Sequence, residues 1–168
     1  EYELANRPEF EIANGVLIRY NNKTENPKDL AIRIPDGVTE IADRVFKGIT
    51  YLASVDLNGV KTVGVEAFAE CTGLKEVIFS SVATLKGGAF SGCTQLEEAY
   101  LPAIVSVGDS AFGGCEKLVS VRLGASLNKI GSQAFLECAQ PEKADERVVL
   151  AVWLEGTNPP AMEEKIFA

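Results

Sequence analysis

The chain has 168 residues, of which 46% are hydrophobic and 24% charged, a composition that fits one globular domain with a sizeable core. Its net charge of −8 disfavours nucleic acid and anionic membrane surfaces as partners, because both are bound through lysine and arginine. Histidine is absent, which excludes serine–histidine and cysteine–histidine catalytic pairs. The sequence contains no apolar run of about 18 residues, the length that a transmembrane helix needs. Glu1-Tyr2-Glu3 is not the basic start of a signal peptide.

Residues 1–29 are predicted to form an N-terminal capping hairpin and loop. Asn14-Gly15 separates two short runs of alternating apolar residues. This pair is a strong hairpin signal, because a type I′ turn needs positive φ at both central positions. We expect strands at 9–13 and 16–20, followed by a polar loop.

A fixed repeat occupies residues 30–139. It is clearest in Val63–Leu74, VGVEAFAECTGL, and it returns at 85–96 and 107–118, with weaker copies before and after. The repeated phenylalanines follow one another at steps of 22, 22, 22 and 23 residues, at Phe46, Phe68, Phe90, Phe112 and Phe135. A period of this length predicts a solenoid, in which each coil stacks on the next.

Each coil carries an alternating run that predicts a strand with one face in the core. The predicted inward residues are Ile32, Ile34, Val55, Leu57, Val77, Phe79, Ala99, Leu101, Val121 and Leu123. A second apolar point follows in each coil, at Ile41, Val63, Leu85, Val107 and Ile130. An alanine–phenylalanine pair then predicts a short helical or 3-10 turn, whose phenylalanine stacks on that of the next coil.

Residues 140–168 break the period. A charged insertion at 140–147 is followed by a run in which Val152 and Leu154 take the places of Val121 and Leu123. We interpret this segment as an insertion and a C-terminal capping repeat, since a solenoid must cover its end coils. All three parts form one domain.

The repeats resemble a known family. Leu74-x-x-Val77-x-Phe79 matches the leucine-rich-repeat consensus, as do the runs that begin at Leu96 and Leu118. The added pattern I-x-x-x-A-F-x-x-C-x-x-L is similar to the BspA-like (Treponema-type) leucine-rich repeats of bacterial surface proteins, although Ile49 stands where cysteine is usual. The resemblance implies a leucine-rich-repeat solenoid of the α/β class, a right-handed coil of short parallel strands with short helical or 3-10 turns and an N-terminal β-hairpin cap.

The resemblance also implies a function. Such proteins are secreted or attached to the bacterial surface, and they bind other molecules without catalysis or cofactors. We therefore expect an extracellular adhesion module that contacts host or matrix proteins. A structural spacer or assembly module of a larger surface protein is an alternative, and a carboxylate-based hydrolase is a remote one.

The four cysteines share one place in the repeat, at Cys71, Cys93, Cys115 and Cys138. Stacked in parallel about 4.8 Å apart, such thiols are expected to be buried and free, because parallel Cβ vectors give poor disulfide geometry. A line of cysteines also lacks the convergence that a metal site needs.

Outward strand positions are where binding can be encoded, because the core does not constrain them. The predicted contact surface comprises Asp56, Glu76, Ile78, Glu98, Tyr100, Arg122 and Trp153. Tyrosine, tryptophan and arginine are enriched in binding hot spots, but Trp153 could instead fold under the insertion. Glu76 and Glu98 should be neighbours and are interpreted as a solvated pair. Asp43, Glu66 and Asp109 are expected to cap short helices or to face water.

Overall fold

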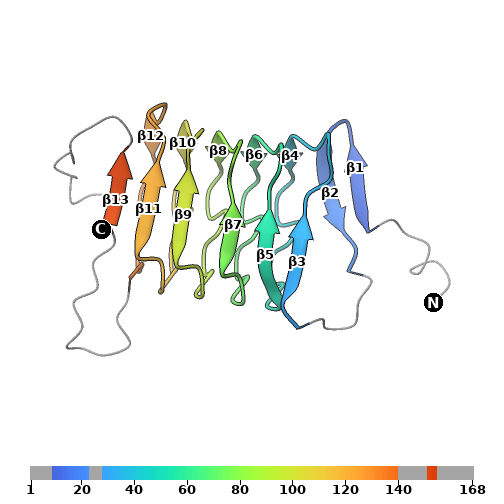
Figure 1. Cartoon of the computed structure of the whole chain (residues 1–168), viewed down its shortest axis with the longest axis horizontal. Coiled ribbons are helices and arrows are strands. Elements are labelled where there is room, and N and C mark those ends of the chain that lie inside the picture. Colours follow the sequence, from blue (N-terminus) through green and yellow to red (C-terminus); the bar gives the residue numbers. More distant parts are fainter. Residues whose placement is uncertain (1–8, 23–27, 140–150, 155–168) are drawn as a thin grey trace.

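The computed structural model describes residues 9–22 and 28–139 together with the backbone of 151–154. Over these residues the chain winds into a stack of coils, each with one strand on the front and one on the back (Figure 1). No residue in this part of the chain lies in a helix, so none there belongs to a helix able to cross a membrane. The predicted repeat is therefore a β-solenoid of stacked parallel coils.

The front of the stack carries the strands that the alternating runs predict. These are β3 (Leu30–Arg33), β5 (Leu52–Asp56), β7 (Glu76–Ile78), β9 (Glu98–Leu101), β11 (Ser120–Leu123) and β13 (Ala151–Leu154). All pairings are parallel, and partners lie one repeat apart, as with Val55 and Val77. Val152 and Leu154 pair with Val121 and Leu123, which confirms the register predicted across the insertion.

The back of the stack is a seven-stranded sheet, in the order β1-β2-β4-β6-β8-β10-β12. Its members are β1 (Phe10–Ala13), β2 (Val16–Tyr20), β4 (Glu40–Ile41), β6 (Thr62–Val63), β8 (Thr84–Leu85), β10 (Ser106–Val107) and β12 (Lys129–Ile130). The second apolar point of each coil lies in these two-residue strands. Two residues are too few to show alternation, so the sequence predicted the apolar positions and not this sheet.

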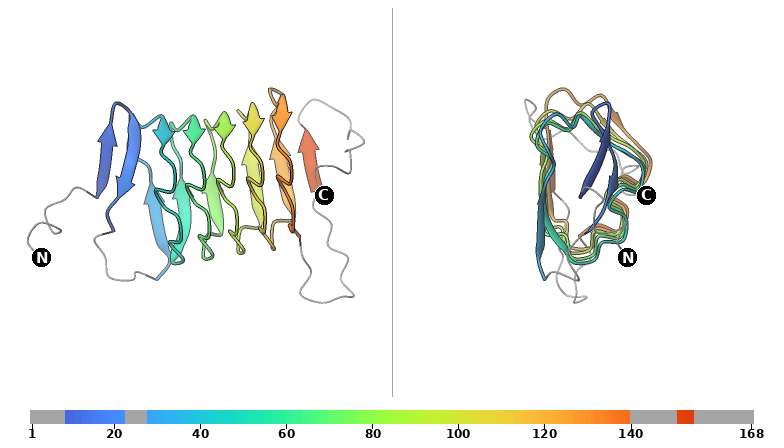
Figure 2. Two further views of the ribbon diagram at one scale, coloured as in Figure 1. Left: turned by 180° about the vertical axis from the view of Figure 1, so that it is seen from behind. Right: turned by 90° about the vertical axis from the view of Figure 1, so that its right-hand side faces the viewer.

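The hairpin predicted around Asn14-Gly15 is present. β1 and β2 pair antiparallel with Ala13 opposite Val16, and φ is 51° at Asn14 and 78° at Gly15. The Tyr20 ring lies 5.1 Å from that of Phe46, and the hairpin crosses the N-terminal end of the coil (Figure 2). Burial, aided by Glu9, raises the pKa of Tyr20 to about 12. The capping role itself stays a prediction.

A column of stacked phenylalanine rings runs through the core and confirms the predicted ladder. Successive ring centroids lie 4.8 Å apart from Phe46 to Phe68 and 4.9 Å from Phe68 to Phe90. The ten predicted inward strand residues are all buried. Each coil therefore holds its neighbours through apolar side chains, and stability comes from contacts between adjacent coils.

The helical or 3-10 turns predicted at the alanine–phenylalanine pairs are wrong. The residues two before and two after each phenylalanine have positive φ, as at Glu66 (53°) and Glu70 (62°), and a helix needs consecutive right-handed residues. Alternate N–H groups point along the stack. The Phe68 N–H donates to the Ala89 carbonyl of the next coil at 2.8 Å, while the Ala69 N–H donates within its own turn to Glu66. Coil-to-coil hydrogen bonding thus replaces helical hydrogen bonding.

The front is divided into two three-stranded sheets, β3-β5-β7 and β13-β11-β9. Within the described residues no ladder joins β7 to β9, although the back sheet continues past this point from β8 to β10. The buried Phe79 stands where neighbouring coils have leucine, and its ring meets Phe90 and Phe112 edge-on at 5.3 and 6.3 Å. The Phe90–Phe112 separation is 5.7 Å and the Phe112–Phe135 separation is 5.6 Å, so the rings are more widely spaced from the gap onward than in the coils before it.

Candidate binding face on the front strands

The outward side chains of the front strands form a surface that we call the front face. Its central column contains Arg33, Asp56, Ile78, Tyr100 and Arg122, and the column beside it contains Ser54, Glu76, Glu98 and Ser120. The period of two in each strand places these residues outside, because the alternate residues fill the core. Parallel stacking then aligns equivalent positions of successive coils within each of the two sheets.

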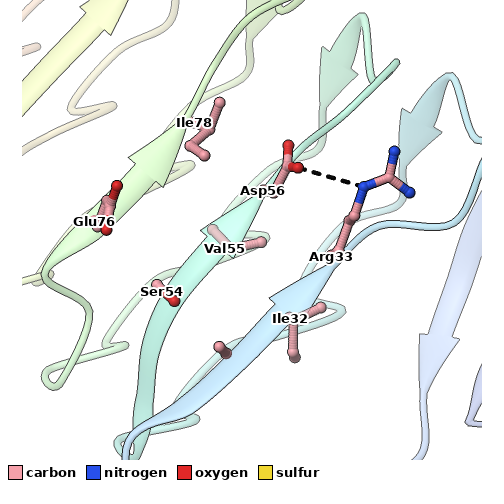
Figure 3. A pocket seen from close by; sticks show the side chains of 8 residues that line it. Ile32, Arg33, Ser54, Val55, Asp56, Glu76 and Ile78 are labelled. Atoms are coloured by element: carbon pink, nitrogen blue, oxygen red, sulfur yellow. Dashed lines mark ion pairs between the residues drawn. The ribbon is translucent and has the colours of Figure 1, made fainter.

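The first half of the front face is a shallow depression of about 280 Å³. Asp56, Glu76 and Ile78 line it together with Arg33, and Figure 3 shows the arginine reaching across to Asp56. The Arg33 Nε lies 3.5 Å from Asp56 Oδ2, and Asp56 Oδ1 accepts the Asn58 N–H at 2.8 Å. Asp56 is therefore largely committed to contacts within the chain.

Asp36 extends this polar cluster beyond the strands. Its Oδ1 accepts a hydrogen bond from Asn58 Nδ2 at 2.8 Å and one from Arg33 Nη1 at 3.2 Å. These two donors, Asn58 first, lower the pKa of Asp36. Arg33 thus lies between two carboxylates at this end of the front face.

The second half of the front face is a smaller depression of about 140 Å³, lined by Glu98, Tyr100, Ser120 and Arg122. The backbone register places Tyr100 beside Arg122 and Arg122 beside Trp153, as predicted. The Trp153 side chain lies outside the described residues, so its part in a contact surface stays a prediction. Arg122 is exposed and can offer its guanidinium to a partner.

Six of the seven predicted contact residues fall into two groups. Asp56, Glu76 and Ile78 meet in the first depression, and Glu98, Tyr100 and Arg122 meet in the second. Glu76 and Glu98 belong to β7 and β9, which the front ladders do not join. Arg33, Ser54 and Ser120 also line the depressions and were not among the predicted residues. They occupy the same outward columns, so the strand phase alone would have found them.

The cysteines are structural, as the repeat phase predicts. All four are free, and Cys71, Cys93 and Cys115 are buried. Each thiol lies within hydrogen-bond reach of a phenylalanine carbonyl in the preceding coil, for example Cys93 Sγ at 3.2 Å from the Phe68 oxygen. Burial raises the pKa of all four thiols, to about 12 for Cys71 and Cys138. Such thiols are poor nucleophiles, because the reactive form is the thiolate.

Ile49 occupies the cysteine position of the first coil. This coil follows the hairpin, and on that side its phenylalanine packs at a tilt against Tyr20 and not against the phenylalanine of a preceding repeat. The thiol-to-carbonyl contact that recurs in later coils joins a cysteine to a phenylalanine of the repeat before it. An apolar side chain suits a coil that lacks that partner.

The remaining carboxylates singled out by the sequence join neighbouring coils. Asp43 accepts the Val65 N–H and Asp109 accepts the Ser132 N–H, both at 2.8 Å, so neither caps a helix. Glu66 is bound by Arg44 at 2.8 Å and by Lys47 at 2.9 Å, and these hydrogen bonds lower its pKa. These three carboxylates therefore hold adjacent coils together.

The chemistry of the front face suits contact more than reaction. Glu76 and Glu98 are solvent-exposed, whereas a carboxylate that acts as a general acid usually sits in an enclosed, apolar site. Within the described part of the chain, no group of three or more acidic, cysteine or histidine side chains could hold a metal ion.

Comparisons with known proteins agree with this architecture. A family model described as "BspA type Leucine rich repeat region" matches residues 24–142 in six copies. The leucine rich repeat protein of T. pallidum is 31% identical with a TM-score of 0.67, over 74% of this chain and 60% of that one. The pneumococcal vaccine antigen PcpA is 23% identical with a TM-score of 0.70, over 95% of this chain and 38% of that one.

A leucine-rich repeat protein from Bacteroides ovatus is 29% identical with a TM-score of 0.51, over 66% of this chain and 35% of that one. This chain therefore spans 60% or less of the length of these three relatives. None of the three is named as an enzyme. No curated protein sequence matches the chain.

Proposed function

The chain belongs to the family of BspA-type leucine-rich repeat proteins, and from this membership we propose that it is a protein-binding module that uses the front face. The observation that carries the proposal is the exposure of Ile78 and Tyr100, at 45% and 50%, in the centre of that face. Most apolar side chains of the repeat fill the core, whereas Ile78 and Tyr100 face solvent and are available to a partner.

The finer proposal is that binding serves adhesion of a bacterium to host or matrix proteins, with the module secreted or held on the cell surface. The resemblance of the repeats to those of bacterial surface proteins supports this location. Tyr100 and Arg122 on the front face are of the residue types that dominate binding hot spots, which supports a protein ligand.

An array of purified host glycoproteins, matrix proteins and glycans tests the proposal. We expect the wild type to bind a defined subset of proteins, and we expect a Tyr100→Ala/Arg122→Ala variant to lose that binding. A matched control is Glu116→Ala/Glu137→Ala, which truncates two exposed side chains away from the front strands. Equal binding by wild type and the Tyr100/Arg122 variant would exclude the front face as the site.

A second function, assembly through the end of the solenoid, is favoured by one observation. Ile12 and Ile18 are 43% and 50% exposed on the hairpin at the N-terminal end of the stack. If two copies pack at this end, the wild type sediments as a dimer and Ile12→Ser/Ile18→Ser sediments as a monomer. A monomeric wild type at high protein concentration excludes this assembly.

A further inference from the structure

The gap between β7 and β9 lies at the centre of the front face, and the side chains on its two sides repeat one arrangement. β7 presents Glu76 and Ile78 outward, and β9 presents Glu98 and Tyr100 at the equivalent positions. All four are exposed. Each side of the gap therefore offers one carboxylate and one apolar group to a partner.

Neither carboxylate beside the gap forms an ion pair within the described residues, although Arg122 lines the second depression together with Glu98. Asp56 on the neighbouring strand has Arg33 at 3.5 Å, and Lys75, which precedes Glu76, lies 3.9 Å from Asp29. Within the residues that the structure describes, no lysine or arginine is within ion-pair distance of Glu76 or Glu98. The chain as a whole carries a net charge of −8, which strengthens the negative potential here.

We infer that the segment bound by the front face is cationic and apolar, a stretch of protein that presents lysine or arginine beside an aliphatic or aromatic side chain. This inference rests on the proposed function and names the chemistry of its partner. The cations lie against Glu76 and Glu98, and the apolar groups cover Ile78 and Tyr100. Apolar burial then supplies affinity, while the charges supply register and exclude acidic partners.

Other occupants fit these side chains less well. An anionic lipid surface or a nucleic acid would be repelled by the two carboxylates. A divalent cation needs several oxygen ligands that converge on one point, and no such group of acidic side chains exists within the described residues. A protein segment satisfies both the charged and the apolar positions.

Three short fluorescent peptides test the inference directly: one of alternating lysine and leucine, one of alternating glutamate and leucine, and one of alternating lysine and serine. We expect the lysine–leucine peptide to bind most tightly at near-physiological salt. In a Glu76→Gln/Glu98→Gln variant its dissociation constant should rise about three- to tenfold, the effect of losing two solvent-exposed charge pairs.

The matched control is Glu116→Gln/Glu137→Gln, which removes the same charge from two exposed glutamates away from the front strands. An equal loss of affinity in both double variants would mean non-specific attraction to an acidic protein and would overturn the inference. Equal affinity of the wild type for the glutamate–leucine peptide, or binding of none of the peptides, would also overturn it.

An Ile78→Ser/Tyr100→Ser variant separates this inference from the proposed function. If it loses the lysine–leucine peptide while Glu76→Gln/Glu98→Gln keeps it, the front face binds without charge selection, so the proposed function stands and the cationic partner is wrong. If neither variant changes binding of the peptides or of the array ligands, both proposals fail.

Discussion

Single residues of this protein are placed by the position they occupy in the coil. The thiol of Cys93 and the ring of Phe90 lie in the core because every coil repeats the same inward phase, and the sequence alone predicted both. The positive φ of Glu66 and Glu70 was not predicted, although glycine stands at the equivalent positions 88 and 92 of the next coil. Non-glycine residues avoid this region locally, so only the hydrogen bonds to the next coil account for it.

The buried thiols predict a loss of stability at alkaline pH. Burial raises their pKa in the folded chain, while an unfolded thiol ionises near 9.0, so the unfolded state loses protons first. The contribution of the buried thiols to folding stability is therefore fully present below pH 9.0, and it is lost as the pH rises towards about 12. Each fully buried thiol contributes a slope of about 1.4 kcal/mol per pH unit in this window.

Urea unfolding at a series of pH values measures this slope. Cys93→Ala removes one buried thiol, and the difference between the variant and the wild type isolates its share from that of Tyr20, whose pKa is also raised. If the two proteins lose stability in parallel above pH 9.0, the thiol does not stay protonated in the fold.

The phenylalanine column predicts a large cost for Phe90→Ala. The Phe90 ring lies 4.9 Å from Phe68, 5.7 Å from Phe112 and 5.3 Å from Phe79, so its removal leaves a cavity in the middle of the stack. We expect the free energy of unfolding to fall by about 3–5 kcal/mol in denaturant titrations. Phe10→Ala, whose half-buried ring packs against Tyr20 beyond the end of the column, should cost less. A loss below about 1 kcal/mol for Phe90→Ala would mean that this column is not the core.

At the scale of the element, each coil is a front strand, a turn and a short back strand that bond mainly to the adjacent coil. Strand phase was predictable because alternation in Ser120–Leu123 is a local signal. The conformation of the turns was not predictable, because alternate backbone N–H groups in them donate hydrogen bonds to the next coil. The gap between β7 and β9 was also invisible in the sequence, since Glu76 and Glu98 have the same phase as residues whose strands do pair.

Phe79 predicts a way to close that gap. Replacement by leucine, the residue at the equivalent positions of the coils on either side, removes the ring that lies edge-on against Phe90 and Phe112 beside the gap. We expect β7 and β9 to form ladder hydrogen bonds in Phe79→Leu, and we expect amide hydrogens of Glu98–Leu101 to exchange more slowly with deuterium. Unchanged or faster exchange there, with wild-type exchange at β11, would show that Phe79 does not keep the strands apart.

At the scale of the whole molecule, the solenoid separates two tasks. Inward residues determine shape, and the front face has side chains that the core leaves unconstrained. The family was predictable from the repeated residues, and the structure adds which outward residues are brought together. The predicted insertion at 140–147 and the C-terminal cap lie outside the described residues, so both stay predictions.

The separation of these tasks is tested most directly by measuring binding and stability together in one variant. Ile78→Ser/Tyr100→Ser changes two exposed side chains of the front face and none of the core. We predict loss of binding to the strongest ligand of the protein array, with a melting temperature within about 2–4 °C of the wild type, the shift that about 1 kcal/mol produces in a chain of this size. Binding at wild-type affinity by this correctly folded variant would contradict the account.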